Sequence, residues 1–170
     1  MQQVLAEFPG AQRALFRRYH IGGCSSCGFQ PEETLTALCA RNGNLNVDEV
    51  MAHIRESHQA DLSIQIAPKD LADWLRREPS LKVVDIRTRE EHETVKIPGS
   101  ILFSQELMQE MLGRWPREAA LVLYDHQGGK SMDAAAYFAG HGFQNVRALS
   151  GGIDAWSREV DPSAPRYQLE

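Results

Sequence analysis

A glycine-containing loop follows the most apolar run of the chain's second half, residues 120–124. The loop combines a carboxylate, an imidazole, an ammonium and a hydroxyl group, and its residues are Asp125, His126, Gln127, Gly128, Gly129, Lys130 and Ser131. Glycines permit unusual backbone angles, and backbone amides at the start of a helix bind anions. The loop is therefore a candidate anion-binding site, although many turns between a strand and a helix have only a structural role.

A second group of reactive side chains lies near the amino terminus, where Cys24 and Cys27 form a glycine-flanked C-x-x-C pair. This spacing suits a zinc ion, an iron–sulfur cluster or a redox disulfide. His20 is a candidate additional ligand, and Cys39 is either a further ligand or a residue of a helical core. A zinc or cluster site usually has a second close cysteine pair, and these three cysteines are all that the chain contains.

The two candidate sites belong to segments with different hydrophobic periodicity. Residues 1–58 are typical of a small domain built only from helices. The residues that mark its apolar faces and helix starts are Leu15, Phe16, Tyr19, Pro31, Leu38, Asp48 and Ile54. We expect Pro31 and Asp48 to lie in the first turns of two helices, and a polar linker to occupy residues 57–61.

From Leu62 onward, short apolar runs alternate with amphipathic segments, which indicates an α/β domain with a mainly parallel sheet covered on both faces. The predicted strands are residues 64–66, 82–86, 101–103, 120–124 and 145–149. The predicted helices are residues 68–77, 106–115 and 131–140. Sites in such folds lie beyond the carboxyl ends of the strands, so the loop after Tyr124 is the expected site. We assign residues 62–160 to this domain and residues 161–170 to a tail.

Four motifs in this second segment resemble those of the rhodanese family and follow the same order. They are the D-x-R-x-x-x-E set of Asp85, Arg87 and Glu91, the I-P-G-S of residues 97–100, the loop at Gly128, Lys130 and Ser131, and the G-G-x-x-x-W of residues 151–156. The resemblance covers residues 62–158 and implies a rhodanese-like, five-stranded parallel sheet flanked by helices. We expect the first motif to form a structural ion-pair network rather than a catalytic set.

The same resemblance aligns Asp125 with the cysteine that accepts sulfur as a persulfide in the family. A thiolate is a strong, soft nucleophile, whereas a carboxylate is a weak one and forms no stable sulfur adduct. We therefore expect no catalytic residue and no thiosulfate sulfurtransferase activity in this degenerate active-site loop, with Lys130 as an ionic partner of Asp125. Besides filling the pocket, Asp125 has two alternative roles, in a partner-binding surface or as a phosphoryl acceptor beside His126.

Residues 2–56 resemble a small helical family of uncharacterised function, whose outline also occurs in proteins associated with hybrid iron–sulfur enzymes and with iron-centre repair. The resemblance implies a redox or metal-linked context and supplies no reaction, so zinc or an iron–sulfur cluster at Cys24 and Cys27 is an expectation from their spacing. Two functions from different classes follow. The protein is either a non-catalytic binding or regulatory module tied to a C-x-x-C domain, or a sulfur carrier or thiol redox protein that uses Cys24 and Cys27.

Composition excludes several other classes of function. The formal net charge is −5 and the pI about 5.7, which gives no general attraction to nucleic acid or to an anionic membrane. No apolar run approaches the roughly 20 residues that span a bilayer, and the first residues lack the features of a signal peptide. We therefore expect a cytoplasmic protein. The two resemblances imply that its partner is another protein, in sulfur or iron–sulfur metabolism.

Overall fold

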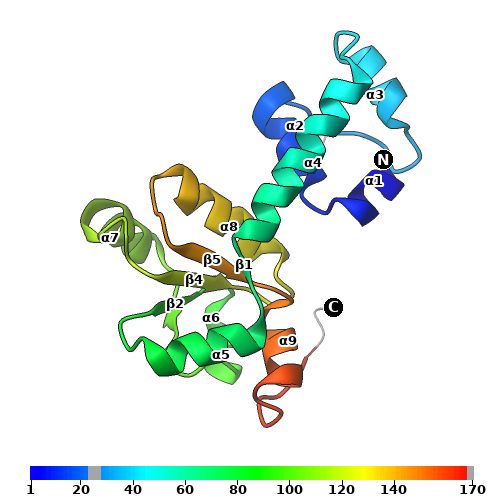
Figure 1. The fold of residues 1–170 in the computed structure, drawn as a ribbon. Helices are drawn as coiled ribbons and strands as arrows, with labels where there is room; N and C mark the ends of the chain where they lie inside the picture. The colour runs from blue at the N-terminus through cyan, green and yellow to red at the C-terminus, as the bar shows by residue number, and fades with distance from the viewer. Residues whose placement is uncertain (23–27, 168–170) are drawn as a thin grey trace. The chain divides into compact units, whose positions relative to one another are not determined.

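The computed structural model describes residues 1–22 and 28–167 (Figure 1). Cys24 and Cys27 lie outside the described residues, so a metal, cluster or disulfide at this pair stays a prediction. The chain divides into two compact units, Met1–Ser63 and Ile64–Glu170. Within the described ranges, no helix is long and apolar enough to cross a membrane.

The first unit is helical in its described part. Its helices are α1 (Gln2–Glu7), α2 (Ala11–Tyr19), α3 (Leu35–Arg41) and α4 (Val47–Ser63). The largest fully buried side chains of its core are Leu15, Leu38 and Ile54. The inner face of α2 differs in part from the prediction: Leu15 is buried as expected, but Phe16 is 47% exposed, and Ala11 and Ala14 pack inward in its place.

Two predicted boundaries in this unit are wrong. Pro31 lies in a turn, and α3 begins only at Leu35, because the Thr34 hydroxyl accepts the Ala37 N–H at 3.1 Å and caps the helix there. The expected linker at residues 57–61 is part of α4, so the predicted domain end at residue 58 falls inside a helix. The polar linker segment contains no glycine or proline to stop the helix.

The second unit contains the predicted sheet, with five parallel strands in the order β1-β5-β4-β2-β3. The strands are β1 (Gln65–Ile66), β2 (Lys82–Asp85), β3 (Ile101–Leu102), β4 (Leu121–Tyr124) and β5 (Val146–Leu149). The apolar run after residue 120 is the central strand, as predicted, and every residue of β4 is buried. The expectation of an α/β fold with a five-stranded parallel sheet flanked by helices is confirmed.

Helices cover both faces of this sheet (Figure 1). They are α5 (Pro68–Arg77), α6 (Arg89–Thr94), α7 (Gln105–Arg114), α8 (Gly129–Gly140) and α9 (Gly152–Glu159). Alternate residues of β4 enter two different cores. Leu121 and Leu123 pack with side chains of α7 and α8, whereas Val122 and Tyr124 pack with side chains of α5 and α9. The strand is therefore anchored on both faces, and its carboxyl end is held firmly in place.

Candidate functional site

The loop after β4 is held from behind by the start of α9. The N–H of Ile153 donates to the carbonyl of Asp125 at 2.9 Å, and the N–H of Asp154 donates to the carbonyl of His126 at 3.1 Å. Gly152, with φ of 57°, permits this contact, because a Cβ atom there would lie 2.5 Å from the Asp125 and His126 carbonyl oxygens. The glycines of the G-G-x-x-x-W motif thus allow two backbone segments to meet.

On the loop side, Gly128 lets the loop backbone approach the backbone of Leu149 and Gly151 closely. Its φ is 93°, a conformation that favours glycine, and a Cβ atom there would lie 2.9 Å from the Gly151 nitrogen and 3.0 Å from the Leu149 carbonyl oxygen. Gly128 is also the N-cap residue of α8, and it has no side chain with which to cap the helix. An acceptor for the first amides of α8 must therefore come from elsewhere.

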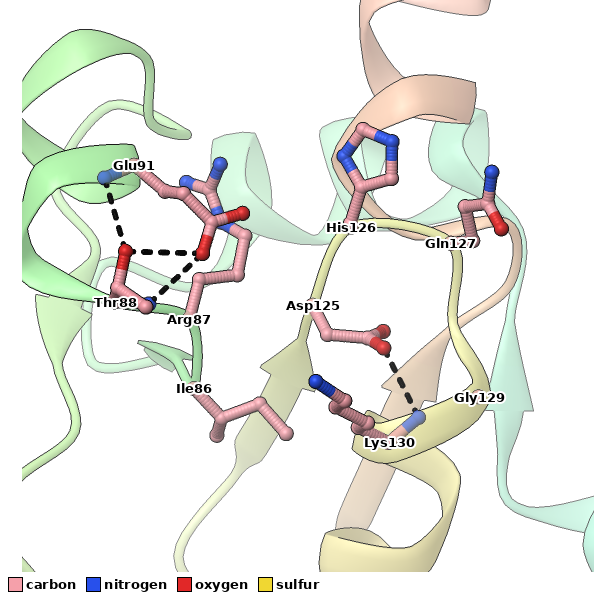
Figure 2. Close-up of a pocket in the computed structure, with 9 residues that line it drawn as sticks. All are labelled: Ile86, Arg87, Thr88, Glu91, Asp125, His126, Gln127, Gly129 and Lys130. Atoms are coloured by element: carbon pink, nitrogen blue, oxygen red, sulfur yellow. Dashed lines mark hydrogen bonds between the residues drawn. The ribbon is translucent and has the colours of Figure 1, made fainter. Parts of the chain in front are cut away.

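Asp125 supplies that acceptor. Its Oδ1 accepts the Gly128 N–H at 2.6 Å and the Ser131 hydroxyl at 2.9 Å, and its Oδ2 accepts the Lys130 N–H at 2.9 Å (Figure 2). The side chain is almost fully buried. A carboxylate from the protein itself thus occupies the predicted anion cradle.

The expected ion pair between Lys130 and Asp125 is not formed in the described structure. The first turn of α8 points the Lys130 backbone N–H at the carboxylate, while the Lys130 side chain runs along the wall of the adjoining pocket (Figure 2). The main chain therefore makes the contact that was expected of the ammonium group.

Asp85, at the carboxyl end of β2, is the centre of a buried polar network. It accepts two hydrogen bonds from the Arg87 guanidinium, from Nε at 2.9 Å and from Nη2 at 2.6 Å, and a third from the Arg87 backbone N–H at 3.0 Å. Its Oδ2 also lies 2.8 Å from His92 Nδ1 and accepts the Tyr124 hydroxyl at 2.7 Å. Burial opposes the charge, but the hydrogen bonds from Arg87, His92 and Tyr124 outweigh it and lower the pKa of Asp85. Asp85, Arg87 and His92 lie together in the interior and fix the loop between β2 and α6.

Tyr167 joins this network to the loop after β4. Its hydroxyl accepts Arg87 Nη1 at 2.7 Å and donates to Glu91 Oε1 at 2.6 Å, and its ring centroid lies 4.4 Å from that of His126. Burial and the hydrogen bond to Glu91 raise the pKa of Tyr167 to about 12. Tyr167 was absent from the predicted site, because it belongs to no motif and was assigned to a tail.

A pocket of about 380 Å³ opens beside Asp125. It is lined by Ile86, Arg87, Thr88 and Glu91 on one side and by Asp125, His126, Gln127, Gly129 and Lys130 on the other (Figure 2). The Nδ1 atom of His126 is buried and has no hydrogen-bond partner among the described residues. The structure thus brings most of the predicted loop together with Arg87 and Glu91 of the D-x-R-x-x-x-E motif around one cavity, while Asp85 lies buried behind them.

The remaining candidates lie in the first unit. Cys39 is 2% exposed in the helical core, and burial raises the pKa of its thiol. His20 is the C-cap of α2, with a left-handed φ of 56°. Among residues 1–22 and 28–167, no group of three or more histidine, cysteine or acidic side chains is placed to hold a metal ion.

Comparison with known proteins gives a consistent result for the second unit. The family model for the rhodanese-like domain matches residues 67–159. Thiosulfate sulfurtransferase GlpE of Pseudomonas aeruginosa is 33% identical over 104 residues, which is 61% of this chain and 92% of that protein. The probable adenylyltransferase/sulfurtransferase MoeZ of Mycobacterium tuberculosis is 32% identical over 114 residues, which is 66% of this chain. The match spans only 29% of the length of MoeZ.

Solved structures share the fold of this unit. The human single-domain sulfurtransferase TSTD1 superposes with a TM-score of 0.50 and 19% identity, covering 56% of this chain and 96% of that one. A rhodanese-like domain from Anabaena superposes with a TM-score of 0.51 and 19% identity, covering 63% of this chain and 87% of that one. At these identities the likeness concerns the fold alone.

Proposed function

This chain belongs to the family of rhodanese-like domains, and we propose that its second unit acts as a non-catalytic binding or regulatory module tied to the helical first unit. The observation that carries this proposal is the hydrogen bonding of Asp125. The loop amides that stabilise an anion are already engaged by a carboxylate. The pocket beside it is open and lined by polar side chains, as a binding site requires.

The chemistry of Asp125 argues against sulfur transfer at this loop. Resemblance to the family aligns Asp125 with the nucleophilic cysteine, and no cysteine follows Cys39 in the chain. A carboxylate does not form a persulfide, and its negative charge repels an anionic sulfur donor such as thiosulfate. Phosphoryl transfer is a weaker proposal, because both oxygens of Asp125 already accept hydrogen bonds from the protein.

A second candidate function is a sulfur carrier or thiol redox protein that uses Cys24 and Cys27. It is favoured by the names of the relatives, several of which are sulfurtransferases, and by the location of all three cysteines in the first 39 residues. In this alternative the C-x-x-C pair holds sulfur, zinc or an iron–sulfur cluster. In both cases we propose a protein partner in sulfur or iron–sulfur metabolism, without nucleic acid or a membrane.

One assay separates the two functions. The whole chain and its Cys24→Ser/Cys27→Ser variant are tested for thiosulfate:cyanide sulfurtransferase activity. The binding-module proposal predicts that neither protein exceeds the buffer rate. Turnover in the parent chain that disappears in the variant would favour the thiol function. Turnover that persists in the variant would place catalysis outside the C-x-x-C pair, at Cys39 or in the loop, and would overturn the proposal.

A further inference from the structure

The segment after α9 places one side chain into the predicted site. Residues 161–167, here called the strap, contain neither a helix nor a strand. We propose that Arg87, Glu91 and His126 form a binding site for a phenol group, which Tyr167 fills from within the chain and which a tyrosine of a partner protein takes in its place. This inference rests on the proposed binding function, because it names the group that the module recognises.

The contacts of Tyr167 define what the site accepts. The hydroxyl group is used twice, as an acceptor for Arg87 Nη1 at 2.7 Å and as a donor to Glu91 Oε1 at 2.6 Å. The ring lies against His126 at a centroid distance of 4.4 Å. A phenol satisfies all three groups together, whereas a phenylalanine ring leaves the Arg87 and Glu91 atoms without these partners.

The site itself is held rigidly by the fold. The side chain of Arg87 is 2% exposed and is fixed by Asp85 on its other edge. Glu91 Oε2 accepts the backbone N–H and the hydroxyl of Thr88, each at 3.0 Å, which leaves Oε1 directed at Tyr167. The arrangement is therefore preformed for an aromatic hydroxyl and needs no rearrangement to accept another one.

Tyr167 is the firm attachment of the strap, through its two hydrogen bonds and its packing against the core. The rest of the strap is held less firmly: among the described residues, its side-chain bond to the unit runs from Arg166 Nε to Asp154 Oδ1 at 2.7 Å, and the side chain of Arg166 is 55% exposed. Irregular segments with exposed anchors open locally at a fraction of the free energy of global unfolding. The strap also lies outside residues 67–159, which match the family.

Displacement of the strap also changes the neighbouring pocket. Arg87, Glu91 and His126 all line the cavity beside Asp125, on two sides of it (Figure 2). Removal of the Tyr167 ring therefore uncovers the face of the His126 imidazole against which it packs. Because the strap competes from within the chain, the apparent affinity of a partner falls in proportion to the closed fraction.

The test uses the whole chain with Tyr167→Ala and 4-methylphenol, which is the side chain of tyrosine with a hydrogen in place of Cα. We expect 4-methylphenol to raise the Tm of the variant and to shift the NMR signals of Glu91 and His126. Toluene, which lacks the hydroxyl group, should bind much more weakly. The parent chain, whose site is filled, should bind 4-methylphenol at least about tenfold more weakly than the variant.

Two further measurements make the test decisive. The control is Tyr137→Ala, since Tyr137 is 44% exposed on α8, and this variant should respond as the parent does. Equal binding to the parent and to Tyr167→Ala, or no binding to either, would overturn the proposal. If Tyr167→Ala does not fold, Tyr167→Phe replaces it. The expected result is then tighter binding of 4-methylphenol than in the parent, and parent-like binding is the contrary one.

N-acetyl-tyrosinamide then tests the partner. It should bind Tyr167→Ala at least as tightly as 4-methylphenol does, and failure to bind would show that the site is closed to a tyrosine in a peptide. These outcomes are independent of the sulfur-transfer assay. Sulfur transfer that survives loss of Cys24 and Cys27 would refute the proposed function and leave the phenol site in place. Failure of 4-methylphenol to bind would refute the phenol site and leave the result of the sulfur-transfer assay unchanged.

Discussion

The Oδ2 atom of Asp125 lies 2.9 Å from the backbone nitrogen of Lys130, in the first turn of α8. This contact makes Asp125 the capping residue of a helix whose formal N-cap, Gly128, has no side chain. A negative charge at the amino end of a helix is stabilised by the helix dipole. The carboxylate that fills the anion cradle therefore also stabilises the structure of the loop.

Asp125→Ala should consequently destabilise the second unit. The change leaves the Gly128 and Lys130 amides and the Ser131 hydroxyl without their acceptor, and we expect a loss of about 1–3 kcal/mol in the free energy of unfolding. Urea unfolding followed by circular dichroism measures it. Asp73→Ala, a change at an exposed residue of α5, is the control and should alter stability by less than about 0.5 kcal/mol. Equal effects of the two changes would show that Asp125 does not cap α8.

The position of this loop could be predicted because it depends on local signals. An apolar run of strand length, followed by two glycines and a helical segment, is enough to place Asp125 at the carboxyl end of a central strand. The helix α6 was missed although its start has a signal, since Thr88 and Glu91 form a capping box. With only six residues, α6 is too short to show a clear periodicity.

Tyr167 could not be predicted in the same way. Its hydrogen-bond partners, Glu91 and Arg87, are 76 and 80 residues away in the chain. No spacing rule connects such distant residues, and only the folded sheet brings them together. The prediction of an ion pair between Lys130 and Asp125 was wrong for a related reason. The backbone geometry of the turn decides whether the N–H or the ammonium group of Lys130 meets the carboxylate, and composition does not reveal that geometry.

The contact between Gly152 and the loop gives a second prediction. Gly152→Ala should destabilise the unit by more than about 3 kcal/mol, because the new Cβ would lie 2.5 Å from backbone atoms of Asp125 and His126 and the φ of 57° is unfavourable for alanine. The matched control is Gly113→Ala in α7, where nothing lies within 4 Å of the added Cβ and the substitution should stabilise the helix by about 0.5–1 kcal/mol. Thermal unfolding of both variants provides the measurement. A tolerated Gly152→Ala would mean that α9 and the loop separate readily.

The buried Asp85 network predicts a dependence of stability on pH. Asp85→Asn leaves the buried Arg87 without its counter-charge, and we expect a loss of about 3–5 kcal/mol at neutral pH. The folded-state pKa of Asp85 is lowered, so the stability it contributes is present above the unfolded pKa of about 3.9 and is lost as the pH falls through the folded value. The difference between parent and variant should therefore be constant above about pH 5 and shrink below about pH 4. Denaturant titrations at a series of pH values measure this, and a difference that grows on acidification would contradict the assignment.

An Asp125→Cys variant tests whether the amides and the hydroxyl group around Asp125 can lower the pKa of a thiol. In an Asp125→Cys variant the new sulfur would lie near the Gly128 and Lys130 amides and the Ser131 hydroxyl, the donors that now bind the carboxylate. Backbone donors and the start of a helix stabilise a thiolate, so its pKa should fall by about one unit or more from about 8.5. The rate of alkylation by iodoacetamide as a function of pH gives the pKa directly.

The three native cysteines must be replaced so that only the new thiol is measured. Cys24 and Cys27 are replaced by serine, and Cys39 by alanine, because Cys39 is 2% exposed in an apolar core where a hydroxyl group would be costly. Adding Ser131→Ala removes one donor and should return the pKa part of the way toward about 8.5. A thiol in Asp125→Cys that titrates near about 8.5, with or without Ser131, would show that the donors keep their arrangement only when a carboxylate accepts their hydrogen bonds. The loop would then be a capped turn and not an anion-binding site.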